Sequence, residues 1–456
     1  MNKPLRLVLI VSILASFVAF LDSSVVNVAL PAITKNLGGG LVSQQWIVDA
    51  YLLTLGSLIL IAGSLSDLFG RKKILAVGLI GFLAASILCG VATSSIFLII
   101  ARAVQGVAGA LIVPSSLALI IATFPKEEQG KAIGQWTAWT GISFVVGPLL
   151  GGFLVDALSW RWVFLINILP IAVTLWLLTI MKVEEKPMPD AHVDFLGAFT
   201  GALGLAGIVY GFIEEPAYGW INPLVFLPLI FGALAAAAFF IFEKRTAQPM
   251  LPLPLFNVRN FAVGNIATVA IYAGLSIATF ILTIFLQLVA GFSAFLAGMS
   301  LLPVTLVMFL LSPRFGALAG KYGPRLFMAL GPIVAAGGFL YYLNVDQSIA
   351  YWTQLFPGIL LFALGLSMTV APLTAAVLGG VDAAHAGVAS AINNAVARIA
   401  GLLAIALIGL IVGANAFSGG TLAANIAAFH KAAIAMAVFL FAGGIISAIG
   451  IENKKS

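Results

Sequence analysis

A chain of 456 residues would ordinarily fold into about three soluble domains. Here 62% of the residues are hydrophobic and 8% are charged, against about 25% charged in an ordinary globular protein, which excludes a soluble surface. The net charge of +6 would suit nucleic acid, but the basic residues lie between apolar blocks, so the charge follows membrane topology and no nucleic-acid partner is expected.

The apolar residues form fourteen blocks, each long enough to cross the hydrocarbon core, which takes roughly 20 residues. In chain order the predicted membrane helices span residues 7–30, 45–66, 74–93, 96–120, 131–155, 162–181, 194–213, 222–242, 260–284, 293–318, 325–343, 352–378, 386–413 and 429–450. The first block follows Lys3 and Arg6, as in a signal peptide. It lacks a small-residue cleavage site and carries Asp22, so we interpret it as a retained helix. The sequence therefore predicts an all-α polytopic membrane protein.

The distribution of Lys and Arg predicts the orientation, since cytoplasmic loops are enriched in both. With the N-terminus inside, the outer segments hold only Lys35, Arg161 and Lys431, while Arg102 and Arg398 fall within spans. The rest of the 22 basic residues then face inward, and an even number of spans places both termini in the cytoplasm. This pattern predicts a multi-pass protein of the cell (inner or cytoplasmic) membrane.

Two polar stretches, 182–190 and 243–254, divide the chain into three sections. We predict an N-terminal six-helix bundle at 1–183, two inserted helices with flanking linkers at 184–255, and a C-terminal six-helix bundle at 256–456. Similar inner loops at 63–71 and 316–325 indicate an internal repeat, a common plan of secondary transporters.

Other chemistries lack their sequence signatures. Cys89 is the only cysteine, and His192, His385 and His430 are far apart, so we expect neither a disulfide framework nor a metal site. The sequence has no G-x-x-x-x-G-K-[ST] phosphate loop and no G-x-S-x-G nucleophile elbow. We therefore expect neither an enzyme nor ATP-driven transport by this chain alone.

Several motifs occur in order along the chain. They are Leu21 to Pro31 with Ser24 where threonine is common; Gly63-x-Leu65-x-Asp67-x-x-Gly70-Arg71 with Leu68 replacing a basic residue; Arg102-x-x-Gln105-Gly106; Gly134, Gly147-Pro148 and Gly151-Gly152 with Ser143 replacing glycine; Trp160 to Asn167; and Leu286-Gln287 with Leu301-Leu302-Pro303. Together they resemble the major facilitator superfamily, specifically its 14-helix drug:proton antiporter branch, the QacA/EmrB-like multidrug exporters. The resemblance covers essentially the whole chain. It implies two six-helix bundles plus two inserted helices, driven by a proton gradient without a cofactor.

Charged residues inside the predicted spans are the first candidates for function, because a charge near the bilayer centre costs about 2.5–3.5 kcal/mol. At about 1.5 Å per residue, Asp22, Asp49 and Arg102 all lie in the outer half of the membrane. If their helices adjoin, as the resemblance implies, the three could share a site with Gln105, one turn from Arg102. We expect Asp22 or Asp49 to couple protons or contact substrate. A static Asp–Arg brace between helices is the alternative.

The resemblance also distinguishes Asp49 from Asp22. An acid after Trp46-Ile-Val at this point is similar to exporters of cationic lipophilic drugs. Arg398, on the thirteenth predicted helix, either faces the central cavity or extends its side chain toward the interface.

The remaining candidates each have a structural alternative. Asp67 and Arg71, with Gly63 and Gly70, would form an inner gate or simply a topogenic loop. The fifth-helix motif would have a role in coupling or would form a simple packing kink. It consists of Gly147, Pro148, Gly151 and Gly152. Glu214 and Glu215 would form an outer cation vestibule or an exposed turn. Trp136, Trp139 and Phe144 are candidates for lining the cavity.

These observations favour a proton-coupled antiporter that exports lipophilic, cationic compounds by alternating access. Export of an endogenous metabolite or lipid by the same mechanism is the alternative. A non-transporting receptor or scaffold is disfavoured, because its buried charges would lack a purpose. The expected partners are a small lipophilic substrate, protons and the lipid bilayer. We expect a monomer, and recruitment of a periplasmic adaptor stays open.

Overall fold

The computed structural model describes residues 3–182, 193–246, 249–381, 386–413, 415–417 and 419–453. The predicted boundary at 183/184, His192 and His385 lie outside these residues. The first part of the chain forms α1 (Lys3–Leu37), α2 (Leu41–Phe69), α3 (Arg71–Gly90), α4 (Ser95–Thr123), α5 (Lys126–Gly141), α6 (Ser143–Ala157), α7 (Trp162–Leu165), α8 (Ile168–Ile180), α9 (Phe195–Tyr218) and α10 (Pro223–Arg245).

The second part begins after α10. It forms η1 (Leu253–Asn257), α11 (Arg259–Leu288), α12 (Ala294–Ser300), α13 (Leu302–Tyr322), α14 (Pro324–Tyr341), η2 (Tyr342–Asn344), η3 (Tyr351–Leu355), α15 (Phe356–Gly379), α16 (Ala386–Val412) and α17 (Leu422–Gly450). The described residues contain fourteen helical stretches long and apolar enough to cross a membrane, which confirms the predicted number.

The predicted helix ends fall short of the observed ones at several places. The first helix continues to Leu37, and the last begins at Leu422 where the apolar block begins at 429. Apolar blocks end where the hydrocarbon ends, whereas backbone hydrogen bonding continues into the polar region. The fifth and tenth spans are each divided, into α5 and α6 and into α12 and α13.

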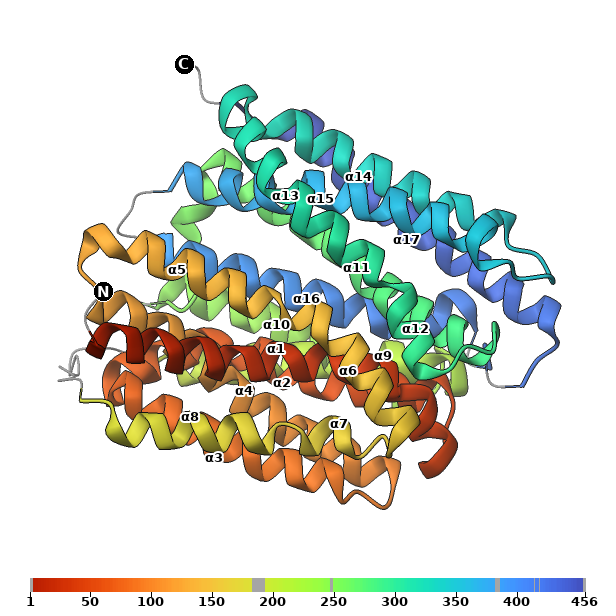
Figure 1. Cartoon of the computed structure of the whole chain (residues 1–456), viewed down its shortest axis with the longest axis horizontal. Helices are drawn as coiled ribbons and strands as arrows, with labels where there is room; N and C mark the ends of the chain where they lie inside the picture. Colours follow the sequence, from red (N-terminus) through yellow and green to blue (C-terminus); the bar gives the residue numbers. More distant parts are fainter. Residues whose placement is uncertain are drawn as a thin grey trace.

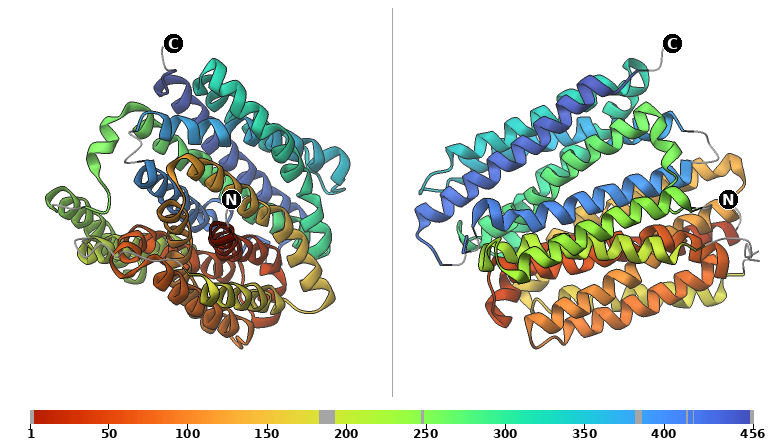
Figure 2. Two further views of the ribbon diagram at one scale, coloured as in Figure 1. Left: turned by 60° about the vertical axis from the view of Figure 1, so that its left-hand side comes forward. Right: turned by 180° about the vertical axis from the view of Figure 1, so that it is seen from behind.

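The helices form two bundles that lie side by side, with both termini at the same end of the molecule (Figure 1). Helices α1 to α8 make one bundle, and α11 to α17 make the other. The hairpin of α9 and α10 lies on one flank, visible from behind in Figure 2. Helix α9 contacts α2 and α16, one from each bundle, whereas α10 packs chiefly on α9.

Corresponding backbone turns support the internal repeat. Gly70 joins α2 to α3 with φ 98°, and Gly323 joins α13 to α14 with φ 87°. Residues with side chains rarely adopt this left-handed region, so glycine suits both turns. The second loop has Gly320 where the first has Asp67, and Asn453 instead accepts a hydrogen bond from the Arg325 backbone N–H at 3.2 Å.

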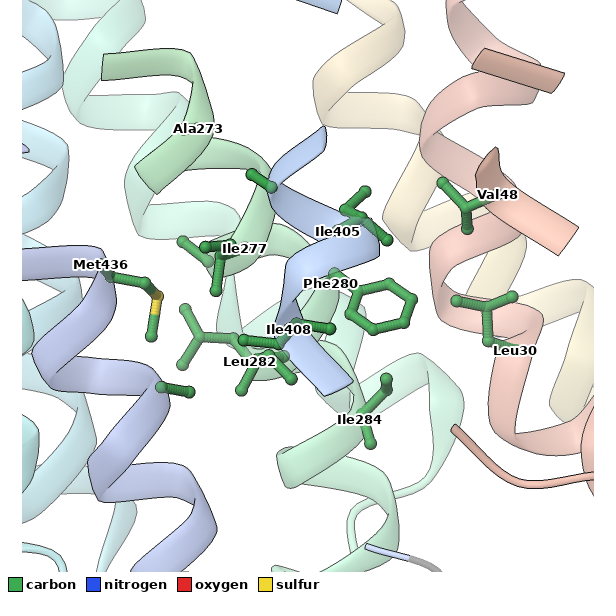
Figure 3. Packing of buried hydrophobic residues seen from close by; sticks show 14 of the residues in the cluster. Leu30, Val48, Ala273, Ile277, Phe280, Leu282, Ile284, Ile405, Ile408 and Met436 are labelled. Atoms are coloured by element: carbon green, nitrogen blue, oxygen red, sulfur yellow. The ribbon is translucent and has the colours of Figure 1, made fainter. Parts of the chain in front are cut away.

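The bundles meet in their outer halves through apolar side chains. Figure 3 shows Leu30 of α1 and Val48 of α2 facing Phe280 of α11 and Ile405 of α16. All four are buried members of one cluster. We call these four residues the outer plug. Because α1 runs outward from the cytoplasmic N-terminus, Leu30 lies near the outer side and the outer plug shuts that side.

The cytoplasmic side is open instead. Two adjoining cavities of about 350 Å³ each lie along α5, and Gln135 lines both. Much of the inner half of α5 is exposed, and its main contacts are with α1, α4 and α6 of its own bundle. The molecule is therefore in an inward-facing form.

Candidate functional site

A buried polar network joins three of the predicted residues. Arg102 of α4 donates to Asp22 of α1 across 2.5 Å between Nη1 and Oδ2. The same nitrogen lies 2.7 Å from Gln105 Oε1, and Gln105 donates from Nε2 to Asp22 Oδ1 at 2.9 Å. All three side chains are buried. The predicted proximity of Asp22, Arg102 and Gln105 therefore occurs in the structure.

Two further members of this network were not predicted. Asn167, just before α8, donates from Nδ2 to Asp22 Oδ1 at 2.9 Å and to Ser86 Oγ at 3.2 Å. Ser86 of α3 also accepts from Gln105 Nε2 at 3.0 Å. Asn167 closes the Trp160 to Asn167 motif, so the sequence carried a signal for it. Ser86 had none.

The network leaves the Asp22 and Arg102 charges well compensated. Both oxygens of Asp22 accept hydrogen bonds, and Arg102 Nε donates to the Ile47 carbonyl at 3.2 Å. The guanidinium carbon also lies 4.2 Å from the centroid of the Tyr51 ring, a favourable cation–π arrangement. Removing one partner of such a buried, hydrogen-bonded pair is costly, because it leaves the other charge uncompensated. In this form the ion pair connects α1 to α4, and the Ile47 bond connects α4 to α2.

Asp49 stands outside this network. Its side chain is fully buried, and neither carboxylate oxygen has a hydrogen-bond partner among the described residues. Gln45, one turn outward on α2, donates to the carbonyls of Ile405 and Ala406 on α16. Residues four apart share a helix face, so Asp49 lies on the face of α2 that meets α16. The shared site that we expected for both acids therefore contains only Asp22.

Arg398 lies on the α16 side of the same junction. Its guanidinium carbon is 5.6 Å from the centroid of the Phe20 ring of α1, and its Cβ lies beside Gly56 of α2. It forms no ion pair within the described part of the chain. Arg398 thus faces the opposite bundle.

The two inner cavities along α5 are lined by residues of the first bundle, with apolar and charged side chains. One of them is lined by Leu9, Ile10, Ile13, Leu14 and Trp139 with Arg6 and Gln135; the other includes Glu128 and Lys131. Trp139 is 57% exposed and lines the first of these cavities, beside α1. Trp136 packs within its own bundle, and the side chain of Phe144 lies outside the described residues.

The predicted gate loop is held within its own bundle. Arg71 Nη2 lies 2.8 Å from Asp67 Oδ1, and the two residues of this ion pair are four positions apart. Gly70 supplies the left-handed turn, whereas a Cβ on Gly63 would meet nothing within 4 Å. Both residues belong to the first bundle, so this ion pair does not connect the two bundles in this form.

The glycines of α6 allow close approach on two sides. A Cβ on Gly147 would collide with Ser24 of α1, and one on Gly151 would lie 3.0 Å from Val25 Cγ2. On the other side, a Cβ on Gly152 would lie 2.5 Å from the Ala294 carbonyl oxygen of α12. The Pro148 carbonyl in turn approaches Gly298. The motif thus brings α6 against α1 and against the second bundle.

Glu214 joins the hairpin to the first bundle. Its Oε1 accepts a hydrogen bond from Trp46 Nε1 of α2 at 2.8 Å, and the Trp46 ring packs on Tyr210. Glu215, beside it, is half-buried. The structure therefore places Glu214 in a contact between helices and leaves the vestibule role untested.

Comparison with known proteins places the chain in context. The sequence profile of the Major Facilitator Superfamily matches residues 12–405. The chain is 34% identical over 420 residues to the multidrug resistance protein Stp of Mycobacterium tuberculosis (strain CDC 1551 / Oshkosh), covering 91% of this chain and 77% of Stp. It is 32% identical to the methylenomycin A resistance protein of Bacillus subtilis (strain 168), covering 95% and 94%.

A solved structure gives the same fold at low identity. The bacterial homolog of the human lysosomal transporter Spinster, in an inward-facing and unoccupied conformation, superposes with a TM-score of 0.66 at 16% identity. The superposition covers 99% of this chain and 97% of that one.

Proposed function

Because the chain belongs to the major facilitator superfamily, we propose that it is a proton-coupled antiporter that exports lipophilic, cationic compounds by alternating access. It is a multi-pass protein of the cell membrane, with fourteen membrane helices among its described residues. Relatives that share about a third of its residues are named for resistance to drugs and antibiotics. Drug export is therefore the activity, and the coupling ion and substrate charge are our proposals.

The observation that carries the proposal is Asp49. A carboxylate buried without any hydrogen bond is costly while it is charged and alone. Either a proton or a bound cation removes that cost, and one carboxylate cannot hold both. Exclusive occupancy is the physical requirement of antiport, because the carrier then crosses with a proton or with a cationic substrate. Asp49 also lies where the two bundles meet, so their motion changes its surroundings.

Asp22 suits a different role. Arg102, Gln105 and Asn167 already hydrogen-bond its carboxylate, so a proton or substrate would first have to displace them. We propose that Asp22, Arg102 and Gln105 position α1 and α4 around the cavity.

The bundles 1–183 and 256–456 would be the rocking units, with 184–255 as an accessory insertion. Such rocking exposes a site near the membrane centre to each side in turn. The proton gradient supplies the driving force, and no cofactor is required.

The test is transport in proteoliposomes with an imposed pH gradient, using a monovalent and a divalent cationic dye and a neutral analogue. Wild-type protein should release protons when a cationic dye is added. Asp49→Asn should lose this coupling by about 5- to 150-fold, the usual range for linked sites. Asp346→Asn is the matched control, because Asp346 is an exposed carboxylate that binds Ser348 in an outer loop.

Two results would contradict the proposal. Equal proton release by wild type and Asp49→Asn would remove Asp49 from coupling. Equal handling of cationic and neutral dyes by both proteins would remove cation recognition.

A further inference from the structure

The outer junction between the bundles is held by side chains that bind backbone. Gln45 of α2 donates to the carbonyls of Ile405 at 2.7 Å and Ala406 at 3.1 Å on α16. Gln287 of α11 donates to the Val28 carbonyl of α1 at 2.9 Å. Asp156 of α6 accepts from two backbone N–H groups of α12. Within the described chain, no ion pair crosses between the bundles.

Asp156 is the one charged member of this set. Its Oδ1 lies 3.1 Å from the Ala294 nitrogen, and its Oδ2 lies 2.9 Å from the Phe295 nitrogen. These are the first two N–H groups of α12, which have no partner inside the helix. The hydroxyl of Ser293, the residue just before α12, accepts a hydrogen bond from the third N–H group, that of Leu296. A carboxylate of one bundle therefore completes the cap of a helix in the other.

The cap stands at the end of a close backbone contact. Gly152, one turn before Asp156 on α6, leaves room for the Ala294 carbonyl, and Gly298 of α12 leaves room for the Pro148 carbonyl. Because backbone atoms make this contact, no side chain can rotate to maintain it when the two helices move apart. When the outer halves separate, the Asp156 bonds must break together with this contact.

We propose that Asp156 is the outer latch of the transport cycle, a positioning residue that sets the share of molecules in the inward-facing form. Its side chain is exposed, and its two hydrogen bonds are charge-assisted, unlike those of Gln45 and Gln287. They exist only while the outer side is shut, so they favour that form over the outward-facing one. The latch rests on the alternating access proposed above.

The experiment measures access to the outer plug. Val48→Cys introduces a thiol into the plug, and a membrane-impermeant thiol reagent is added from outside. Protein with only the native Cys89, which is buried, is the blank. Adding Asp156→Ala to Val48→Cys should raise the labelling rate about tenfold or more, because both acceptor bonds are lost. Asp156→Asn should give an intermediate rate, since one amide oxygen still accepts.

Asp346→Asn in the same background is the control for loss of an outer carboxylate that touches one bundle only. It should label at the Val48→Cys rate. Labelling of Asp156→Ala at that same rate, in protein that elutes as a folded species, would overturn the latch. If Asp156→Ala does not fold, the Asn variant decides, and its labelling at the Val48→Cys rate overturns the proposal.

The labelling rate does not depend on the substrate. Faster labelling in the Asp156 variants, combined with a failure to transport any cationic dye, would keep the latch and reject the proposed coupling. Normal proton release with unchanged labelling would reject the latch and keep the proposed coupling.

Discussion

At the scale of single residues, Asp22 and Asp49 differ by their partners. The sequence marks both as acids within membrane helices, and it predicts the neighbourhood of Asp22, Arg102 and Gln105. It does not predict that Asn167 completes the shell of Asp22, because the two lie 145 positions apart. It also does not predict the isolation of Asp49. The rotation of a helix about its axis is hard to predict when the helix is apolar on every side.

The Asp22–Arg102 pair gives a prediction about stability. Arg102→Gln removes the charge that faces a buried carboxylate, and breaking a buried pair on one side costs about 3–5 kcal/mol. We expect the free energy of unfolding in detergent to fall by that amount. The double variant Asp22→Asn with Arg102→Gln should recover part of it, since no lone charge remains.

Arg71→Gln is the control for this prediction. It breaks the ion pair with Asp67, whose side chain is 38% exposed. The free energy of unfolding should therefore fall by less than about 1 kcal/mol. Equal losses for Arg71→Gln and Arg102→Gln would contradict a bracing role for the buried pair.

At the scale of elements, the fifth span shows what a motif can and cannot predict. The glycines and Pro148 indicate a bend or a close contact, and the structure shows close contacts. Which helices make those contacts depends on packing between α6, α1 and α12, and spacing along one helix does not contain this. Most helix positions are predictable to within a few residues, because burial in lipid requires long apolar blocks.

Two glycines of this span give a matched pair of variants. A Cβ on Gly152 would lie 2.5 Å from the Ala294 carbonyl, whereas one on Gly134 would meet nothing within 4 Å. We expect Gly152→Ala to destabilise the outer contact by about 1–3 kcal/mol, as overpacking does, and to slow dye export. Gly134→Ala should export at the wild-type rate. Similar export by both variants would show that the Gly152 contact is dispensable.

At the scale of the whole molecule, the inward-facing form predicts one-sided access. Trp139→Cys, in the inner cavity, should react with an impermeant thiol reagent in inside-out vesicles, and Val48→Cys should react slowly from either side. The native Cys89, fully buried, again measures the background. Rapid reaction of Val48→Cys from outside would mean that the outward-facing form is the major one.

The arrangement of the bundles is only partly predictable. The repeated inner loops predict two related halves, and the polar stretches predict the inserted pair. The sequence does not predict which form predominates, since the same helices serve both forms. The place of the hairpin is not predictable either, because most of its contacts with α2 and α16 are made by apolar side chains that would also suit lipid.

The position of that hairpin makes the two flanks of the transporter unequal. On one flank α9 covers the line where α2 meets α16, and α10 adds a further layer. On the other flank α6 meets α12 without such a cover. The wall between the bundles is therefore thicker on the hairpin flank than on the flank where α6 meets α12.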